Sequence, residues 1–174
     1  MKNIGSLKIV RRTDLEVVMT RAFDAPRNLV YDALTKPELL KRWLSGPPGP
    51  GWSMPVCEVD LKVGGSYRFV WRNTDGSELS MRGVYREIAP PERLVNTESF
   101  VLGVDVLAGE QLATSVLTEQ AGRTTLTTTI LYSSKEARDA IFGADMERGV
   151  IASYDRLDEV LASGVAGVAF SGNA

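Results

Sequence analysis

The chain has 174 residues, 44% of them hydrophobic, and its 20 Lys and Arg nearly balance its 22 Asp and Glu, which leaves a net charge of −2. This length is typical of one globular domain whose core can enclose a cavity, and the near-neutral charge argues against nucleic acid as a partner. There is no histidine, a single cysteine (Cys57) and no nucleotide-binding glycine motif, so we expect no Ser-His-Asp or Cys-His relay, no disulfide, no metal site and no cofactor.

The N-terminal segment, residues 1–13, is basic and lacks the continuous apolar stretch of a signal peptide. We expect it to be an extension of a single domain at residues 14–163, which a loose apolar tail follows at residues 164–174. That tail is roughly half as long as a membrane-spanning helix, and the lone cysteine suits a reducing compartment. We therefore expect a cytoplasmic protein that does not insert into a membrane.

A strand and two short helices open the domain. Apolar and polar side chains alternate over residues 15–23, which predicts a strand with one buried face that includes Leu15. Asp24 suits the cap and Pro26 the first turn of a following helix. A second short helix is expected around residues 39–43, where apolar side chains recur with helical spacing.

A rigid loop and a run of strands follow. Three Pro and three Gly within residues 45–52, here called the Pro-Gly loop, exclude a helix or a central strand there. Turn signals then separate six apolar segments, which we expect to be consecutive strands of an antiparallel meander. These segments are residues 56–61, 67–71, 79–88, 94–101, 111–119 and 124–132.

Helical patterning returns near Ser134, where either Ser134 or Ser133 suits the cap, and breaks near Gly143. Beyond the break, apolar side chains recur every three or four residues and predict one amphipathic helix of roughly twenty residues. Such a helix can cover the concave face of a curved sheet, and the gap between the two is a natural ligand site. The apolar stripe consists of Met146, Val150, Tyr154, Leu157 and Leu161.

Taken in order, five stretches of the chain resemble the START-related SRPBCC superfamily, and within it the AHSA-type branch, named after the activator of the ninety-kilodalton heat-shock-protein ATPase. They are RAFDAPRNLVYDALTKPELLKRWL (21–44), a GPxGxxxP-like stretch (47–55), VGGSYRFVWRNTDG (63–76), RGVYREIAPPERLVNTESF (82–100) and MERGVIASYDRLDEVLAS (146–163). The resemblance implies an α+β helix-grip (START/Bet v-like) fold. In that fold a curved antiparallel sheet wraps around a long C-terminal helix, two short helices follow the first strand, and a hydrophobic tunnel separates sheet and helix.

Aromatic residues are the first candidates for the wall of that tunnel. Tyr67, Phe69 and Trp71 alternate along one strand and form either a wall that stacks on a flat ligand or ordinary core. Trp43 and Trp52 bracket the Pro-Gly loop and either close the mouth of the cavity or anchor secondary structure. We favour the structural role for Trp43, leave Trp52 open and keep Trp52 as a candidate.

The long helix and one acidic residue supply the other candidates. Met146, Val150 and Tyr154 face the sheet as core or as cavity lining, and the small Gly149 and Ser153 create either space for a ligand or a close backbone approach. Glu98 shares the parity of apolar strand residues and points inward. A buried Glu98 has a raised pKa and can act as acid or base; the more common alternative is an ion pair with one of the nearby arginines Arg68, Arg72, Arg82 and Arg86.

The function expected from these patterns is non-enzymatic binding of a small hydrophobic molecule, lipid-like, aromatic or polyketide-like, between the sheet and the long helix. One alternative is a cyclase- or hydrolase-like enzyme that acts in the same cavity. The other is a regulator of a chaperone ATPase, although eukaryotic activators carry an N-terminal domain that this sequence lacks. Exposed edge strands are also compatible with a homodimer.

Overall fold

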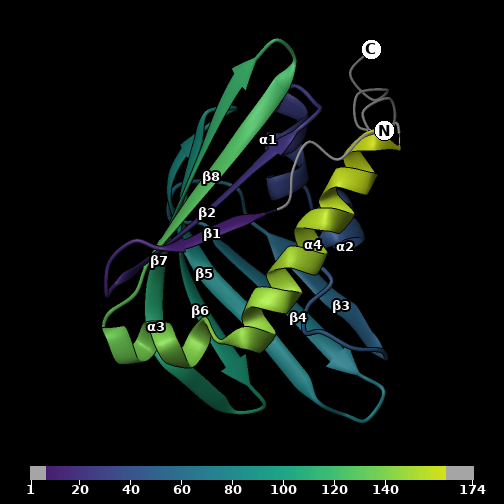
Figure 1. Cartoon of the computed structure of the whole chain (residues 1–174). Coiled ribbons are helices and arrows are strands. Elements are labelled where there is room, and N and C mark those ends of the chain that lie inside the picture. Colours follow the sequence, from purple (N-terminus) through teal and green to yellow (C-terminus); the bar gives the residue numbers. More distant parts are fainter. Residues whose placement is uncertain (1–6, 164–174) are drawn as a thin grey trace.

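An eight-stranded antiparallel sheet in the order β1-β2-β8-β7-β6-β5-β4-β3 organises residues 7–163, the part of the chain that the computed structural model describes. The strands are β1 (Lys8–Arg11), β2 (Glu16–Phe23), β3 (Trp52–Val59), β4 (Ser66–Asn73), β5 (Glu78–Ala89), β6 (Arg93–Leu102), β7 (Asp105–Gln120) and β8 (Arg123–Leu131). The helices are α1 (Arg27–Thr35), α2 (Pro37–Trp43), α3 (Lys135–Ile141) and α4 (Ala144–Ala162). The sheet curves around α4, which crosses its face diagonally (Figure 1), so the predicted helix-grip fold is confirmed.

Strand β2 carries the docking point of α4. Its inward positions are buried, as the alternation predicts, but Leu15 lies just before the strand and is 39% exposed, so its place on the buried face was predicted wrongly. One inward position is Arg21, whose side chain is fully buried and whose Nη1 lies 2.5 Å from Asp155 Oδ1. Its Nη2 lies 3.6 Å from Asp158 Oδ2. Two carboxylates of α4 thus compensate the desolvation of one buried guanidinium.

The two predicted caps have different outcomes. Helix α3 begins after Ser134, whose side chain accepts a hydrogen bond from Ala137 N at 3.0 Å, as expected. Helix α1 begins one residue later than predicted, with Pro26 as its N-cap and no side-chain cap, so Asp24 does not cap it. The Arg27 amide instead donates to Glu119 Oε1 at 2.7 Å. A carboxylate from the end of β7 therefore satisfies a first-turn amide, a long-range contact that local sequence does not reveal.

The six predicted strands are all present as β3–β8, whereas β1 was not expected. β1 pairs with β2 from Lys8 opposite Thr20 to Arg11 opposite Val17. It is short and mostly exposed, so it lacks the alternation that marks a half-buried strand. β7 also begins six residues before the predicted segment, because its first residues form an exposed hairpin with the end of β6. The domain boundary at residue 14 and the homodimer remain predictions.

Within residues 7–163, the helices are too short or too polar to cross a membrane.

A close backbone approach between β5 and β6 depends on Gly83. A Cβ atom built at Gly83 would lie 1.8 Å from Thr97 O and 2.7 Å from Tyr67 Cε1. Tyr67 lies opposite Gly83 in the β4–β5 register, and its hydroxyl donates to Thr97 O at 2.6 Å. Gly83 therefore gives the Tyr67 ring the space to cross to β6.

Replacement of Gly83 by alanine should lower the free energy of unfolding by about 3 kcal/mol or more, because the new methyl group meets backbone that cannot move alone. Urea denaturation measures the effect, and Ser80→Ala on the same strand is the matched control. A Gly83→Ala protein as stable as the control would contradict the close approach.

Candidate ligand-binding cavity

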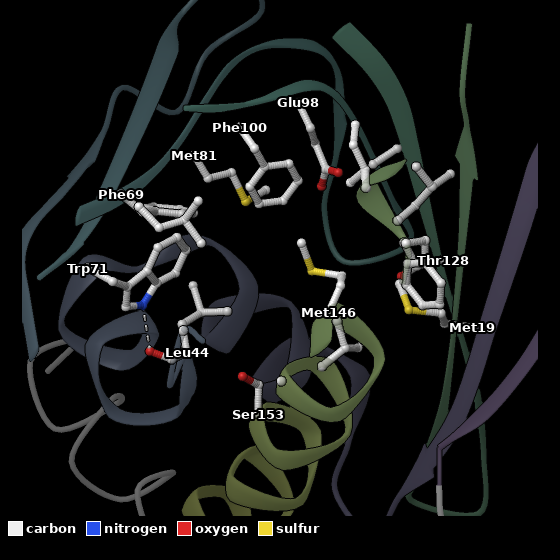
Figure 2. A pocket seen from close by; sticks show the side chains of 18 of the residues that line it. Met19, Leu44, Phe69, Trp71, Met81, Glu98, Phe100, Thr128, Met146 and Ser153 are labelled. Atoms are coloured by element: carbon white, nitrogen blue, oxygen red, sulfur yellow. Dashed lines mark hydrogen bonds between the residues drawn. The ribbon is translucent and has the colours of Figure 1, made fainter. Parts of the chain in front are cut away.

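A cavity of about 470 Å³ lies between the concave face of the sheet and α4. Strands β4–β8 and β2 supply one wall, α4 the opposite wall, and the Pro-Gly loop with α2 one end. Figure 2 shows Trp71, Phe69, Met81, Phe100 and Glu98 along the sheet, facing Met146 and Ser153 of α4. Seven of the eight predicted site residues line this cavity: Tyr67, Phe69, Trp71, Glu98, Met146, Val150 and Tyr154.

The aromatic wall of the cavity is continuous along β4. The ring centroids of Tyr67 and Phe69 are 5.1 Å apart, and those of Phe69 and Trp71 are 6.3 Å apart with an edge-to-face angle of 70°. Backbone carbonyls take up both polar ends: Trp71 Nε1 donates to Leu44 O at 3.2 Å, and the Tyr67 hydroxyl donates to Thr97 O. The three residues are thus at once buried core and cavity lining, with ring surface directed inward.

The Pro-Gly loop is held directly on α4. The Ser45 amide donates to Ser153 Oγ at 3.2 Å, and the two serine hydroxyls are 3.0 Å apart. A Cβ atom at Gly149 would lie 3.0 Å from Gly46 O. Both residues thus allow the loop to approach closely, and both also line the cavity. The loop closes one end of the cavity with Gly46, Pro47 and Pro48.

The two tryptophans that bracket the loop differ. Trp43 is buried, donates from Nε1 to Ala33 O at 2.8 Å and packs against the Tyr154 ring at 5.7 Å, so it anchors α2 as favoured, and it also lines the cavity. Trp52 does not line the cavity. It lies at the start of the edge strand β3, opposite Asn73 and past the end of the aromatic wall, where it is half-buried against the core.

Glu98 on β6 brings the carboxylate of the site into this apolar space. Its side chain is partly accessible, and that surface faces the cavity (Figure 2). Burial raises the pKa of Glu98 from 4.5 to about 7, which the neighbouring Gln111 amide partly offsets. Gln111 lies opposite Glu98 in the β6–β7 register and is buried, yet neither of its amide atoms makes a hydrogen bond of normal geometry.

No cation neutralises Glu98, so the ion pair considered for it is not formed within residues 7–163. The reason is strand parity. The arginines of β4 and β5 alternate with the residues that line the cavity and are exposed on the other face of the sheet, where Arg72 pairs with Glu78 at 2.9 Å. The exposed residues are Arg68, Arg72, Arg82 and Arg86.

The other polar groups of the lining are largely paired with one another. Asn96 Nδ2 donates to the Tyr67 hydroxyl at 3.1 Å, and the hydroxyls of Ser115 and Thr128 are 3.1 Å apart. Burial raises the pKa of Tyr154 to about 12, with Thr128 lowering it in part. In the described part of the chain, no three acidic or thiol groups gather so that they could hold a metal ion.

Several lining residues were not predicted from sequence, among them Met19, Met81, Leu94 and Phe100. Met81 pairs with Phe100 in the β5–β6 register, and Phe100 shares the parity of Glu98. Such residues can be found from one inward-facing residue, because alternate residues of its strand and the residues paired with them on the neighbouring strands face the same side of the sheet.

Comparison with known proteins identifies a matching family and solved structures of similar fold. Residues 24–162 match the family described as "Activator of Hsp90 ATPase homolog 1-like protein". A crystal structure of a Rhodobacter sphaeroides protein is 31% identical with a TM-score of 0.81, over 91% of this chain and 99% of that one. One from Nitrosomonas europaea is 27% identical with a TM-score of 0.74, over 88% of this chain and 98% of that one. No curated protein matches the chain.

The raised pKa of Glu98 predicts a pH-dependent stability. The folded protein holds this proton more tightly than the unfolded chain, so stability is lost as the pH rises from about 4.5 through about 7. Glu98→Gln removes this loss. Its free energy of unfolding relative to wild type should therefore increase by about 2 kcal/mol between pH 5 and pH 8.

Urea denaturation at both pH values measures this difference. The control is Glu110→Gln, which replaces an exposed carboxylate on β7 next to Gln111. The control should differ from wild type by less than about 0.5 kcal/mol at either pH. An equal effect of Glu98→Gln at pH 5 and pH 8 would mean that Glu98 is not desolvated.

Proposed function

The chain belongs to the activator of Hsp90 ATPase homolog 1-like family, and from this membership and its cavity we propose that it binds a small hydrophobic molecule between the sheet and α4. The observation that carries the proposal is the cavity itself, about 470 Å³ of space behind an unbroken aromatic wall. Ligand pockets for small molecules typically measure about 300–1,000 Å³ and are mostly apolar.

The size of the cavity distinguishes it from a packing defect. Protein interiors contain few voids larger than a water molecule, because each void costs the contacts that its lining would otherwise make. A space of this size beside Phe69, Trp71 and Met146 leaves apolar surface without partners. An apolar ligand would make those contacts and would gain roughly 25 cal/mol of binding free energy for each Å² of apolar surface that it buries.

The shape of the aromatic wall favours a flat ligand. Tyr67, Phe69 and Trp71 form an aromatic row on β4, and their polar atoms are already bonded to backbone carbonyls. Ring faces and edges remain for contact, and offset or edge-to-face aromatic pairs add roughly 0.5–1.5 kcal/mol beyond area burial. An aromatic or polyketide-like skeleton suits this wall.

A second candidate function is proton transfer on a ligand within the cavity. It is favoured by the position of Glu98, a carboxyl that faces the cavity and whose pKa of about 7 suits a general acid or base at neutral pH. Turnover of an aromatic or polyketide-like compound that is lost in Glu98→Gln would support this candidate, whereas binding without turnover would support the binding function alone.

Titration with the neutral fluorescent probe N-phenyl-1-naphthylamine tests the binding function. Val150 lies on the cavity wall and the exposed Ala152 lies two residues further along α4. Val150→Phe should weaken probe binding about tenfold because the larger ring occupies the cavity, whereas Ala152→Phe should change it less than twofold. Thermal unfolding confirms that both variants fold. A wild-type protein that binds neither this probe nor any member of a panel of hydrophobic compounds would contradict the proposed function.

A further inference from the structure

The charged side chains that line the cavity are all acidic. Its lining, which lies within the described residues, includes two acidic side chains and neither Lys nor Arg. Asp145 is exposed near the start of α4 and pairs with Arg148. Glu98 is the interior one, on the β6 wall, and no cation pairs with it. A ligand that enters this space meets one uncompensated carboxyl group in an apolar environment.

Resting on the proposed binding function, we propose that the ligand carries a hydrogen-bond donor, best a protonated amine, on an aromatic or apolar body, and that Glu98 is its polar anchor. Figure 2 shows the Glu98 carboxyl directed into the cavity between Phe100 and Thr128, on the side that faces Met146 of α4. A ligand whose apolar part contacts the aromatic wall therefore shares the cavity with the Glu98 carboxyl.

The groups that face Glu98 from neighbouring elements carry no positive charge. The Tyr67 hydroxyl on β4 is committed to Thr97 O. Burial and the nearby Glu98 raise the pKa of Tyr67, of Tyr132 just after β8 and of Tyr154 on α4, so all three phenols stay neutral. Gln111 on β7 lies opposite Glu98 and its neutral amide lowers the pKa of that carboxyl only in part, without a hydrogen bond of normal geometry.

The cations that act on the neighbouring Tyr132 and Tyr154 are committed elsewhere. Arg138 donates to Thr13 O at 2.6 Å and pairs with Asp139. Arg11 donates to Phe142 O at 3.2 Å and lies 3.5 Å from Glu147. The Arg21 guanidinium pairs with two aspartates of α4. A buried carboxylate without a partner is costly, so a cationic or donor group from a ligand is favoured there and a carboxylate ligand, such as a fatty acid, is opposed.

The pH dependence of binding should therefore differ in sign for cations and anions. Near pH 8 Glu98 is mostly ionised and attracts an ammonium group, while near pH 6 it is mostly protonated. An amine ligand should lose about tenfold in affinity when the pH falls from 8 to 6, since the ionised fraction of Glu98 falls by that factor. The affinity of a carboxylate ligand should rise over the same interval.

Three probes with the same naphthalene body test this inference by isothermal titration: 1-naphthylmethylamine, 1-naphthalenemethanol and 1-naphthoic acid. At pH 8 the wild-type protein should bind the amine at least about tenfold more tightly than the acid, as expected for a charge-assisted hydrogen bond. Glu98→Gln should lower the amine-to-acid ratio by about tenfold and remove its pH dependence. Glu110→Gln removes an exposed carboxylate and should leave the ratio unchanged.

The outcomes separate the two proposals. If the alcohol binds and Val150→Phe weakens it, but the acid binds as tightly as the amine or Glu98→Gln leaves their ratio unchanged, the role of Glu98 is overturned and the cavity still binds ligands. If wild-type protein binds none of the three probes and none of the hydrophobic panel, the proposed function fails and the ligand class fails with it. If Glu110→Gln lost the preference for the amine as much as Glu98→Gln, the preference would come from the net charge of the protein, and this would also overturn the role of Glu98.

Discussion

The space between α4 and the sheet depends on the attachment of that helix at a few points along its length. In the C-terminal half of α4, two aspartates bind the buried Arg21 of β2. At its start, Arg11 of β1 contacts Phe142 O and Glu147. In the middle, Ser153 is bonded to Ser45 of the Pro-Gly loop. These polar, directional contacts act together with the apolar packing of Tyr154 and Leu157, and the stretch of helix toward Met146 borders open space.

That arrangement makes one surface serve as both core and lining. Phe69 and Trp71 are almost fully buried, yet they border open volume, since the helix does not press against them everywhere. Glu98 is desolvated for the same reason: it faces an apolar space enclosed by the sheet and the helix. The chemistry of the cavity therefore follows from the geometry of the grip, and the family's fold alone does not determine it.

Local patterns in the sequence predicted most of this geometry. Alternation and turn residues located β3–β8, and the apolar stripe located α4 with Met146, Val150 and Tyr154 on its inner side. Contacts between distant segments were not predictable in this way. The pairing of Arg21 with α4 and the satisfaction of the α1 amide by Glu119 each join residues that only the folded chain brings together. Trp52, whose role was left open, illustrates the same limit: its proximity in sequence to the loop does not bring it to the cavity.

The methionine methyl groups provide the most direct test of the central claim that the cavity admits a ligand. Met19, Met81 and Met146 line it from three different elements, whereas Met54 on β3 does not. In protein labelled with ¹³C at the methionine methyl groups, titration with 1-naphthalenemethanol should shift the resonances of Met19, Met81 and Met146 with one common dissociation constant and leave that of Met54 unchanged. If the first three resonances stay in place at saturating probe, or if Met54 shifts with them, the probe does not occupy the cavity between sheet and helix.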